Sequence, residues 1–322
     1  MRPALLLAAL VGLSGCVLAE RAVVGFVYDK ARVPEANVRE DLAYVDGPEA
    51  DPKKHRLDLF LPVADSVRAR PWPTVVFVHG GSWIEGDKDL TFGGQDVYGN
   101  VGRFFAAHGI GGAVISYRLQ PGVVWQEQVH DVARAVARVR ELVAEEGGNP
   151  DALVLAGHSA GGHLVARVAV DAPAQARAGL DGAAVCGVVP VSAAGLDLED
   201  RRTYEIADNY DFYTRRFAPP GTPVTEAIPE APAPWQREAS TLPLVTAAAP
   251  PFLILYAGGD YPALIHQAGL LAERLAAVGV PHETVVVPGR SHARIIPTLS
   301  RDDQTAGPAM LAFVRGLRCG EG

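Results

Sequence analysis

The sequence lacks the features that mark a metalloprotein, a nucleic-acid-binding protein or a repeat protein. Its three cysteines and nine histidines include no pair at the spacing of metal ligands, so neither a metal site nor a cofactor is expected. The formal net charge of -8 at pH 7 argues against nucleic acid or an anionic lipid surface as an electrostatic partner. There is no internal repeat or low-complexity tract. The chain has 322 residues, 48% of them hydrophobic, which allows one large α/β domain with a full core.

The apolar run at the N-terminus, residues 4–13, is too short to span a bilayer as a folded helix. A basic residue precedes this run, and the combination is typical of an export signal. Leu13-Ser14-Gly15-Cys16 then resembles the lipobox of bacterial lipoproteins, in which cleavage precedes a lipid-modified cysteine. We therefore expect an export signal over residues 1–15 and an exported protein that a lipid on Cys16 anchors to a membrane of the cell envelope. Ordinary cleavage after Ala19 is the alternative, and it also leads to export.

Two further cysteines remain in the exported chain. Cys186 lies in an apolar, strand-like run, and Cys319 lies near the C-terminal end. Because exported proteins meet oxidising conditions, these cysteines could pair, and two unpaired thiols are the alternative.

Residues 16–41 carry weak structure signals and are expected to link the anchor to a domain over residues 42–322. Two short β-type runs, residues 42–45 and 56–61, flank a turn region and predict an antiparallel hairpin at the edge of a sheet. Residues 193–248 interrupt the regular alternation of expected strands and helices in this domain, because they are rich in proline and acidic residues and contain no clear strand. Such an insertion is either a lid or substrate-binding cap or a surface excursion.

Six apolar runs of four to six residues alternate with helical patterns in the rest of the chain. Runs that are apolar on both faces are typical of strands covered by helices on both sides of a sheet. The expected strands are residues 74–78, 113–116, 152–156, 184–189, 252–256 and 284–287. The expected helices are residues 125–146, 160–170, 263–278 and 304–317. This alternation predicts an open, doubly wound α/β fold with a mainly parallel sheet.

The segment Gly157-His158-Ser159-Ala160-Gly161 joins an expected strand to an expected helix. A serine between two glycines at this spacing is typical of a sharp turn that exposes the serine hydroxyl. We expect Ser159 to be a nucleophile, and a serine that only caps the helix is the alternative. Because a serine hydroxyl is a poor nucleophile at neutral pH, this interpretation requires a base, an acid and oxyanion donors elsewhere.

The oxyanion donors are expected after the first of the six strands, at His79-Gly80-Gly81-Ser82-Trp83. Two glycines there let the backbone curl so that its N–H groups point at a substrate oxygen. We expect these donors to be the amides of Gly81 and Ser82, together with the amide of Ala160 after the nucleophile. His79 precedes the turn, and we expect it to brace the loop rather than to act in catalysis.

The acid is expected at Asp260, just past the strand over residues 252–256. Two glycines hold Asp260 close to the strand end, which places its carboxylate at the same edge of the sheet as Ser159. Asp197, a few residues past the preceding strand, is the alternative acid, but it opens the irregular insertion.

The base is expected at His292, which follows the last expected strand on a turn-forming loop. His282 precedes that strand and therefore falls at the opposite edge of the sheet. His266, in an expected helix close to Asp260, is the competing base.

Five motifs together resemble the bacterial carboxylesterases of the α/β-hydrolase superfamily, near its hormone-sensitive-lipase-like, feruloyl-esterase-like and kynurenine-formamidase-like groups. The motifs are His79-Gly80-Gly81-Ser82-Trp83, Gly86-Asp87-Lys88, Ser116-Tyr117-Arg118-Leu119, Gly157-His158-Ser159-Ala160-Gly161-Gly162-His163 and Gly259-Asp260. The similarity extends from about residue 44 to residue 317. It implies an α/β-hydrolase fold and a catalytic triad in the chain order Ser, Asp, His.

In such enzymes the HGG loop supplies the oxyanion amides, which fall on Gly81 and Ser82 here, with Ser82 in place of a third glycine. The resemblance implies that Trp83, next to this loop, either lines the acyl pocket or packs in the core. Arg290-Ser291 departs from the small residues that often precede the catalytic histidine.

These expectations describe a serine hydrolase that cleaves a small-molecule carboxylic ester through an acyl-enzyme intermediate, in which His292 activates Ser159 and Asp260 orients His292. An amidase or arylformamidase would use the same triad. A non-catalytic binding module on the same fold is the third alternative, and the complete set of Ser, Asp, His and glycines argues against it.

Overall fold

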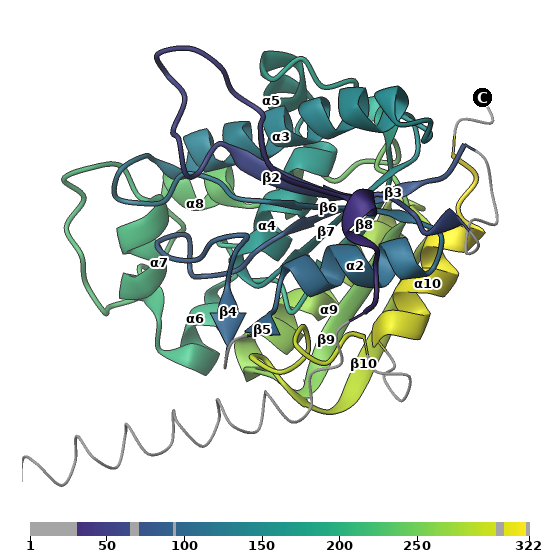
Figure 1. Cartoon of the computed structure of the whole chain (residues 1–322). Coiled ribbons are helices and arrows are strands. Elements are labelled where there is room, and N and C mark those ends of the chain that lie inside the picture. Colours follow the sequence, from purple (N-terminus) through teal and green to yellow (C-terminus); the bar gives the residue numbers. More distant parts are fainter. Residues whose placement is uncertain (1–30, 65–70, 93–94, 301–305, 320–322) are drawn as a thin grey trace, which may run out of the picture.

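The computed structural model describes residues 31–64, 71–92, 95–300 and 306–319 (Figure 1). The expected export signal and Cys16 lie outside these residues. In the described ranges, no helix combines the length and the apolar character that crossing a bilayer requires.

A twisted sheet forms the centre of the molecule (Figure 1). In the described residues it has eight strands, in the order β1-β2-β6-β3-β7-β8-β9-β10. Strand β2 pairs antiparallel with β1 and β6, and all the later neighbours pair in parallel. The strands are β1 (Val38–Ala43), β2 (Arg56–Phe60), β3 (Thr74–Val78), β6 (Gly111–Ile115), β7 (Leu153–His158), β8 (Val185–Val191), β9 (Phe252–Gly259) and β10 (His282–Ser291). A separate small hairpin pairs β4 (Thr91–Phe92) with β5 (Gln95–Asp96).

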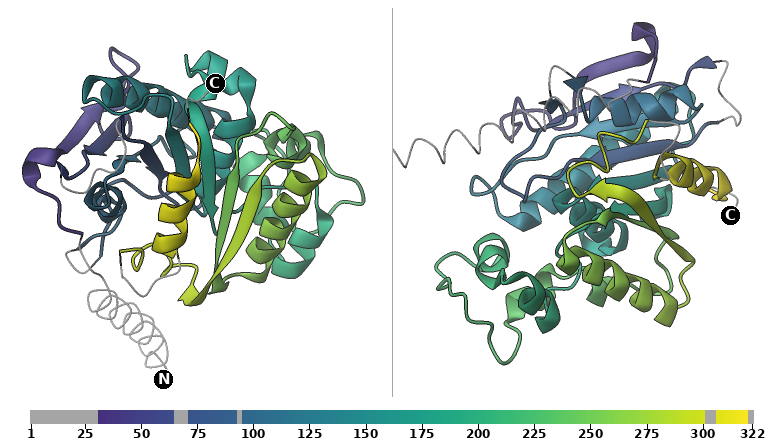
Figure 2. Two further views of the ribbon diagram at one scale, coloured as in Figure 1. Left: turned by 90° about the vertical axis from the view of Figure 1, so that its right-hand side faces the viewer. Right: turned by 90° about the horizontal axis from the view of Figure 1, so that it is seen from below.

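Helices cover both faces of this sheet (Figure 2). Helices α2 (Gly99–Ala107) and α10 (Ala306–Gly316) pack on one face, and α3 (Trp125–Glu145), α4 (Ala160–Val170) and α9 (Pro262–Ala277) pack on the other. The short helix α5 (Ala172–Arg177) follows α4. The central strands are buried on both faces, which explains why their sequences are apolar throughout rather than alternating. The mainly parallel, doubly wound α/β fold predicted from the sequence is confirmed.

Several elements differ from the expectations, since neither α5 nor the hairpin of β4 and β5 was predicted. Strand β1 begins at Val38, so the sheet takes up residues that were expected to belong to the linker over residues 16–41. Helix α2 was not predicted, because its short sequence contains two glycines, which are poor helix formers. One of these glycines is required by packing: a Cβ at Gly102 would lie only 2.2 Å from the Phe60 ring.

The insertion over residues 193–248 is helical and lies at the carboxyl ends of the strands. It contains α6 (Arg201–Ala207), α7 (Tyr210–Phe217) and α8 (Pro234–Ala239), with a single-turn helix at Leu242–Leu244. Figure 2 shows α6, α7 and α8 grouped beside the main body. Arg167 of α4 holds this segment by donating to the carbonyls of Glu238 (2.7 Å) and Ser240 (2.8 Å).

Cys186 and Cys319 form a disulfide, which decides between the two alternatives left by the sequence. Their Cα atoms are 5.6 Å apart, a separation typical of disulfides. The bond ties the start of β8 to the segment that follows α10, across a sequence separation of 133 residues.

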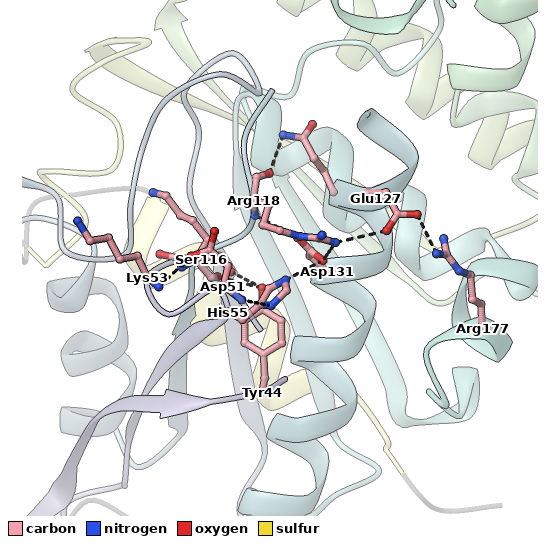
Figure 3. A network of polar contacts seen from close by, with 11 residues as sticks. Tyr44, Asp51, Lys53, His55, Ser116, Arg118, Glu127, Asp131 and Arg177 are labelled. Carbon is pink, nitrogen blue, oxygen red and sulfur yellow. Dashed lines mark hydrogen bonds and ion pairs between the residues drawn. The ribbon is translucent and has the colours of Figure 1, made fainter. Parts of the chain in front are cut away.

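A buried polar network joins the start of β2 to α3 and to the loop after β6 (Figure 3). The Asp131 carboxylate, which is fully buried, accepts from His55 Nε2 (3.2 Å) and from two nitrogens of Arg118 (2.8 and 2.7 Å). His55 Nδ1 accepts from the Asp51 amide (2.9 Å), so its proton lies on Nε2 and the imidazole is neutral. Burial opposes ionisation of Asp131, but the hydrogen bonds from His55 and Arg118 hold its pKa below the usual value.

Replacing Asp131 with asparagine should therefore destabilise the fold by about 3 kcal/mol, because the Arg118 guanidinium loses its buried carboxylate partner and keeps only the longer ion pair with Glu127 (3.3 Å) among its described contacts. The free energy of unfolding, measured in urea at pH 7, tests this. The pKa of Asp131 is lower in the folded state than in the unfolded state. The extra stability of wild type over the variant should therefore be complete above the pKa of Asp131 in the unfolded state, and it should be lost as the pH falls through the pKa of Asp131 in the folded state. Glu141→Gln, in an exposed pair with Arg138, is the control and should cost less than about 0.5 kcal/mol. A loss below about 1 kcal/mol for Asp131→Asn would contradict the assigned role.

Candidate active site

Ser159 lies on a sharp turn between β7 and α4. Its backbone adopts φ 55° and ψ -117°, a region that residues other than glycine seldom enter. The turn is tight because a Cβ at Gly157 would come within 2.3 Å of the Gly161 carbonyl oxygen. The amide of Ser159 donates to the Val191 carbonyl of β8 (2.9 Å), which fixes the turn to the neighbouring strand. This geometry matches the strand-turn-helix context predicted from the glycine spacing.

The loop after β3 adjoins this serine. A Cβ at Gly80 would lie 3.2 Å from the Ser159 Cβ, so the two segments are in direct contact. Three consecutive residues have positive φ: Gly81 (120°), Ser82 (52°) and Trp83 (64°). In the described part of the chain, the amides of Gly81 and Ser82 donate to no other protein group. Together with the amide of Ala160 in the first turn of α4, these amides can donate hydrogen bonds to a ligand oxygen.

His79 braces this loop, as its position predicted. Its ring is buried and stacks on Tyr117, with ring centroids 4.4 Å apart, and its Nδ1 donates to the Gly80 carbonyl (2.7 Å). Burial lowers the pKa of His79 to about 4, so the ring is neutral near pH 7. On the other side of the loop, Gln128 of α3 donates to the Trp83 carbonyl (2.7 Å). The loop is therefore held at both ends by buried side chains.

The structure does not support the substrate contact considered for Trp83. The side chain is fully buried and packs against aromatic rings of the insertion. The ring centroid of Trp83 lies 4.8 Å from that of Phe217 and 6.2 Å from that of Tyr213, and the ring also contacts His163 of α4. Trp83 thus joins the loop after β3 to the insertion, which is the packing role left open by the sequence.

Asp260 and His292 are brought together, although they lie on loops after different strands. His292 Nδ1 donates to Asp260 Oδ1 at 2.9 Å, and the Asp260 side chain is fully buried. The Tyr261 amide donates to the same oxygen (2.8 Å). Burial opposes ionisation of Asp260, but the hydrogen bonds from His292 and from Ser192 hold its pKa below the usual value. An ionised carboxylate in this position fixes the imidazole tautomer that leaves Nε2 free to accept a proton.

The competing residues pair elsewhere. His266 Nε2 lies 2.9 Å from Asp200 of the insertion, not from Asp260. The Asp197 carboxylate accepts from the Glu199 amide (2.9 Å) and contacts no described histidine. The structure thus pairs His292 with Asp260, whereas His266 pairs with Asp200 and Asp197 accepts from a backbone amide.

Two residues at this site carried no signal that sequence reasoning used. His158, directly before Ser159, packs against His292 with ring centroids 4.6 Å apart and the rings tilted at 39°, and it donates from Nε2 to the His292 carbonyl (3.0 Å). Burial and the nearby His292 lower the pKa of His158 to about 3, so it is neutral at physiological pH. Ser192, at the end of β8, donates from its hydroxyl to Asp260 Oδ2. A polar residue directly after a central strand was the only signal for Ser192.

His158 also places His292 beside Ser159, because it contacts His292 and directly precedes Ser159 in the chain. Among the described contacts, no hydrogen bond joins the Ser159 hydroxyl to the His292 ring. Catalytic hydrogen bonds of this kind are often long before substrate binds. Ser159, the His292 imidazole, the Asp260 carboxylate and the amides of Gly81, Ser82 and Ala160 thus lie at the carboxyl ends of β3, β7, β9 and β10.

Comparison with known proteins agrees with this geometry. The sequence profile of a family described as the alpha/beta hydrolase fold matches residues 75–296. The chain belongs to this family.

Two curated relatives of this α/β hydrolase carry esterase names. Esterase LipC of Mycobacterium tuberculosis is 34% identical over 214 residues, which cover 65% of this chain and 49% of LipC. Isoprenylcysteine alpha-carbonyl methylesterase ICME of Arabidopsis thaliana is 28% identical over 265 residues, which cover 79% of this chain and 56% of ICME. The chain spans about half the length of these curated relatives.

Solved structures show the same fold. Esterase B from Lactobacillus rhamnosis is similar to this α/β hydrolase with a TM-score of 0.68 at 22% identity, over 96% of this chain and 93% of that chain. A truncated carbohydrate esterase from gut microbiota has a TM-score of 0.64 at 17% identity, over 88% of this chain and 98% of that one.

Proposed function

We propose that this α/β hydrolase cleaves carboxylic esters through an acyl-enzyme, with Ser159 as nucleophile, His292 as base and Asp260 as the residue that orients the base. The observation that carries the proposal is the contact of Asp260 with His292, next to a serine on a strained turn. The esterase names of LipC and ICME support it, since they come from curated relatives that share this family.

The reaction begins when His292 Nε2 takes the proton of the Ser159 hydroxyl and the oxygen attacks the ester carbonyl carbon. The resulting oxyanion accepts hydrogen bonds from the amides of Gly81, Ser82 and Ala160. His292 then gives its proton to the leaving alcohol as the carbon–oxygen bond of the ester breaks. Water, deprotonated by the same imidazole, then attacks the acyl carbon. His292 returns the proton to the Ser159 oxygen as the bond between that oxygen and the acyl carbon breaks, and the acid leaves. Throughout, the Asp260 carboxylate stabilises the protonated form of His292.

A fluorophosphonate probe, followed by peptide mapping of the labelled residue, is the direct test of the nucleophile. Labelling should occur on Ser159 and be lost in Ser159→Ala. A panel of p-nitrophenyl esters of increasing acyl length should then be hydrolysed faster than an aryl formamide. Faster cleavage of the formamide would indicate an amidase or arylformamidase instead of an esterase. Absence of labelling would favour a non-catalytic role for the fold.

His158→Ala should lower kcat by about tenfold, because the loop that carries His292 loses both a hydrogen bond and a ring contact. His158→Gln can still donate to the same carbonyl and should lose less. Initial rates with p-nitrophenyl acetate, normalised to folded protein by circular dichroism, measure the difference. An alanine variant with wild-type kcat would show that the loop is held by other contacts.

We further propose that the protein is exported and carries a lipid on Cys16. The charged and apolar N-terminal residues with Leu13-Ser14-Gly15-Cys16 support this, and so does the disulfide between Cys186 and Cys319, since disulfides persist mainly in oxidising compartments. Mass spectrometry of the membrane fraction should find the lipid on Cys16. A Cys16→Ser variant that keeps the same membrane partition and mass would contradict the lipid anchor.

A further inference from the structure

Three neighbouring strands, β7, β8 and β9, lead to polar side chains at the same edge of the sheet: Ser159, Ser192 and Asp260. The two serines are held in the same way. The Ser159 amide donates to the Val191 carbonyl of β8 (2.9 Å), and the Ser192 amide donates to the Leu255 carbonyl of β9 (2.7 Å). Each serine is therefore fixed to the strand that carries the next group of the site.

Ser192 shares a second feature with the nucleophile. Its φ is 48°, and that of Ser159 is 55°, so both lie in the left-handed region that favours glycine. A serine at such a position persists only where its surroundings hold it, and strain of this kind is concentrated at functional sites. For Ser159 the proposed function explains why the position is not occupied by glycine, because the reaction requires the serine hydroxyl. Ser192 requires its own explanation, because its side chain is buried and lies outside the triad.

The Asp260 carboxylate supplies that explanation. Its Oδ1 accepts from His292 Nδ1 (2.9 Å) and from the Tyr261 amide (2.8 Å). Its Oδ2 accepts from the Ser192 hydroxyl and from the Ala257 amide, the latter at 3.3 Å. In the described part of the chain, Ser192 and His292 are thus the two side chains that hold this buried carboxylate. Without the hydroxyl, Oδ2 would keep one long hydrogen bond.

We infer that Ser192 is a positioning residue for the proposed reaction: its hydroxyl fixes the plane of the Asp260 carboxylate and thereby the ring of His292. This inference rests on the proposed function of the same site. The hydrogen bond from the hydroxyl also offsets part of the negative charge of the Asp260 carboxylate, so less of that charge acts on the His292 imidazole.

Loss of the hydroxyl has two separable consequences. The carboxylate can turn about its Cβ–Cγ bond, so the imidazole is less often aligned with Ser159 and kcat falls. More negative charge also faces His292, which stabilises the protonated ring and moves the acidic limb of the pH profile to higher pH. Among the described residues, the titratable groups that contact this ring are Asp260, His158 and Tyr261, and burial keeps His158 neutral.

The test compares Ser192→Ala and Ser192→Gly with wild type in the full chain, using p-nitrophenyl acetate from pH 5 to 9. Both variants should lose about tenfold in kcat with KM within about twofold, and the midpoint of the acidic limb should rise by about half a pH unit. Glycine is favoured at the φ of Ser192, so Ser192→Gly tests the hydroxyl even where Ser192→Ala folds poorly. Ser240→Ala is the matched control, because Ser240 is a buried serine with two hydrogen bonds, to Gln236 and Leu198, outside the site. It should leave both kcat and the limb unchanged.

Two outcomes would overturn the inference while wild type is active. A Ser192→Gly variant with wild-type kcat and an unmoved acidic limb would show that Ser192 serves the backbone turn alone. A loss of kcat in Ser192→Gly without movement of the limb, matched by Ser240→Ala, would show a general effect of removing a buried hydroxyl. If wild type itself neither reacts with the fluorophosphonate nor cleaves esters, the proposed function fails instead.

Discussion

Ser159→Ala should lower kcat for ester hydrolysis by about five to six orders of magnitude. The expected loss is this large because alanine removes the attacking oxygen, so the acyl-enzyme cannot form. The free amides of Gly81, Ser82 and Ala160 remain in the variant, and they leave a residual rate above that of the reaction in water. The variant should fold normally, since the contacts described for Ser159 are made by its backbone.

The measurement is the rate of p-nitrophenyl acetate cleavage by protein purified without contact with active enzyme, because a trace of wild type would hide so large a loss. Ser240→Ala, prepared in parallel, should retain activity within about twofold. Retention of more than about one percent of wild-type kcat by Ser159→Ala would exclude this serine as the nucleophile.

The sheet and the positions of the three proposed triad residues could be predicted because their signals are local. A parallel strand between two helical layers is apolar on both faces, so each central strand is visible in a short window of sequence. The turn at Ser159 admits only glycine at two neighbouring positions, since a Cβ at Gly157 or Gly161 would come within about 2.3 Å of backbone oxygen. Asp260 and His292 follow the ends of β9 and β10, so the parallel pairing of these strands brings them together.

The residues that sequence reasoning missed depend on contacts between distant segments. The Ser192 hydroxyl meets a carboxylate 68 positions away, and His158 meets a carbonyl 134 positions away. Neither pairing leaves a periodic pattern in the sequence. The disulfide between Cys186 and Cys319 is of the same kind, because only the fold brings the start of β8 to the segment after α10.

Trp83 illustrates the opposite case, in which a motif is recognised and its role is not. The loop at Gly80-Gly81-Ser82 was located from sequence, but the next side chain packs against Tyr213 and Phe217 of α7, inside the insertion, as well as against His163 of α4. That insertion has no strands and a high proline content, so its sequence did not show which of its short helices would pack against the loop. Burial of the indole by Tyr213 and Phe217 turns a candidate substrate contact into a packing contact.

Asp260→Asn should lower kcat by about four orders of magnitude, and it distinguishes the acid from its rival. The amide nitrogen of asparagine is a donor, so it favours the imidazole tautomer with the proton on Nε2, which cannot accept the proton of Ser159. The neutral amide also stops stabilising the protonated ring that forms during the reaction. The shape of the side chain is kept, so the fold should change little.

Asp197→Asn is the matched control, because Asp197 is the alternative acid in the chain and asparagine can still accept from the Glu199 amide. Its kcat should remain within about twofold of wild type, with both variants assayed at the same pH and folded concentration. A large loss in Asp197→Asn together with an active Asp260→Asn would move the acid to the end of β8 and require the His292 loop to rearrange in solution. The 2.9 Å contact of His292 with Asp260 in the folded chain predicts the reverse.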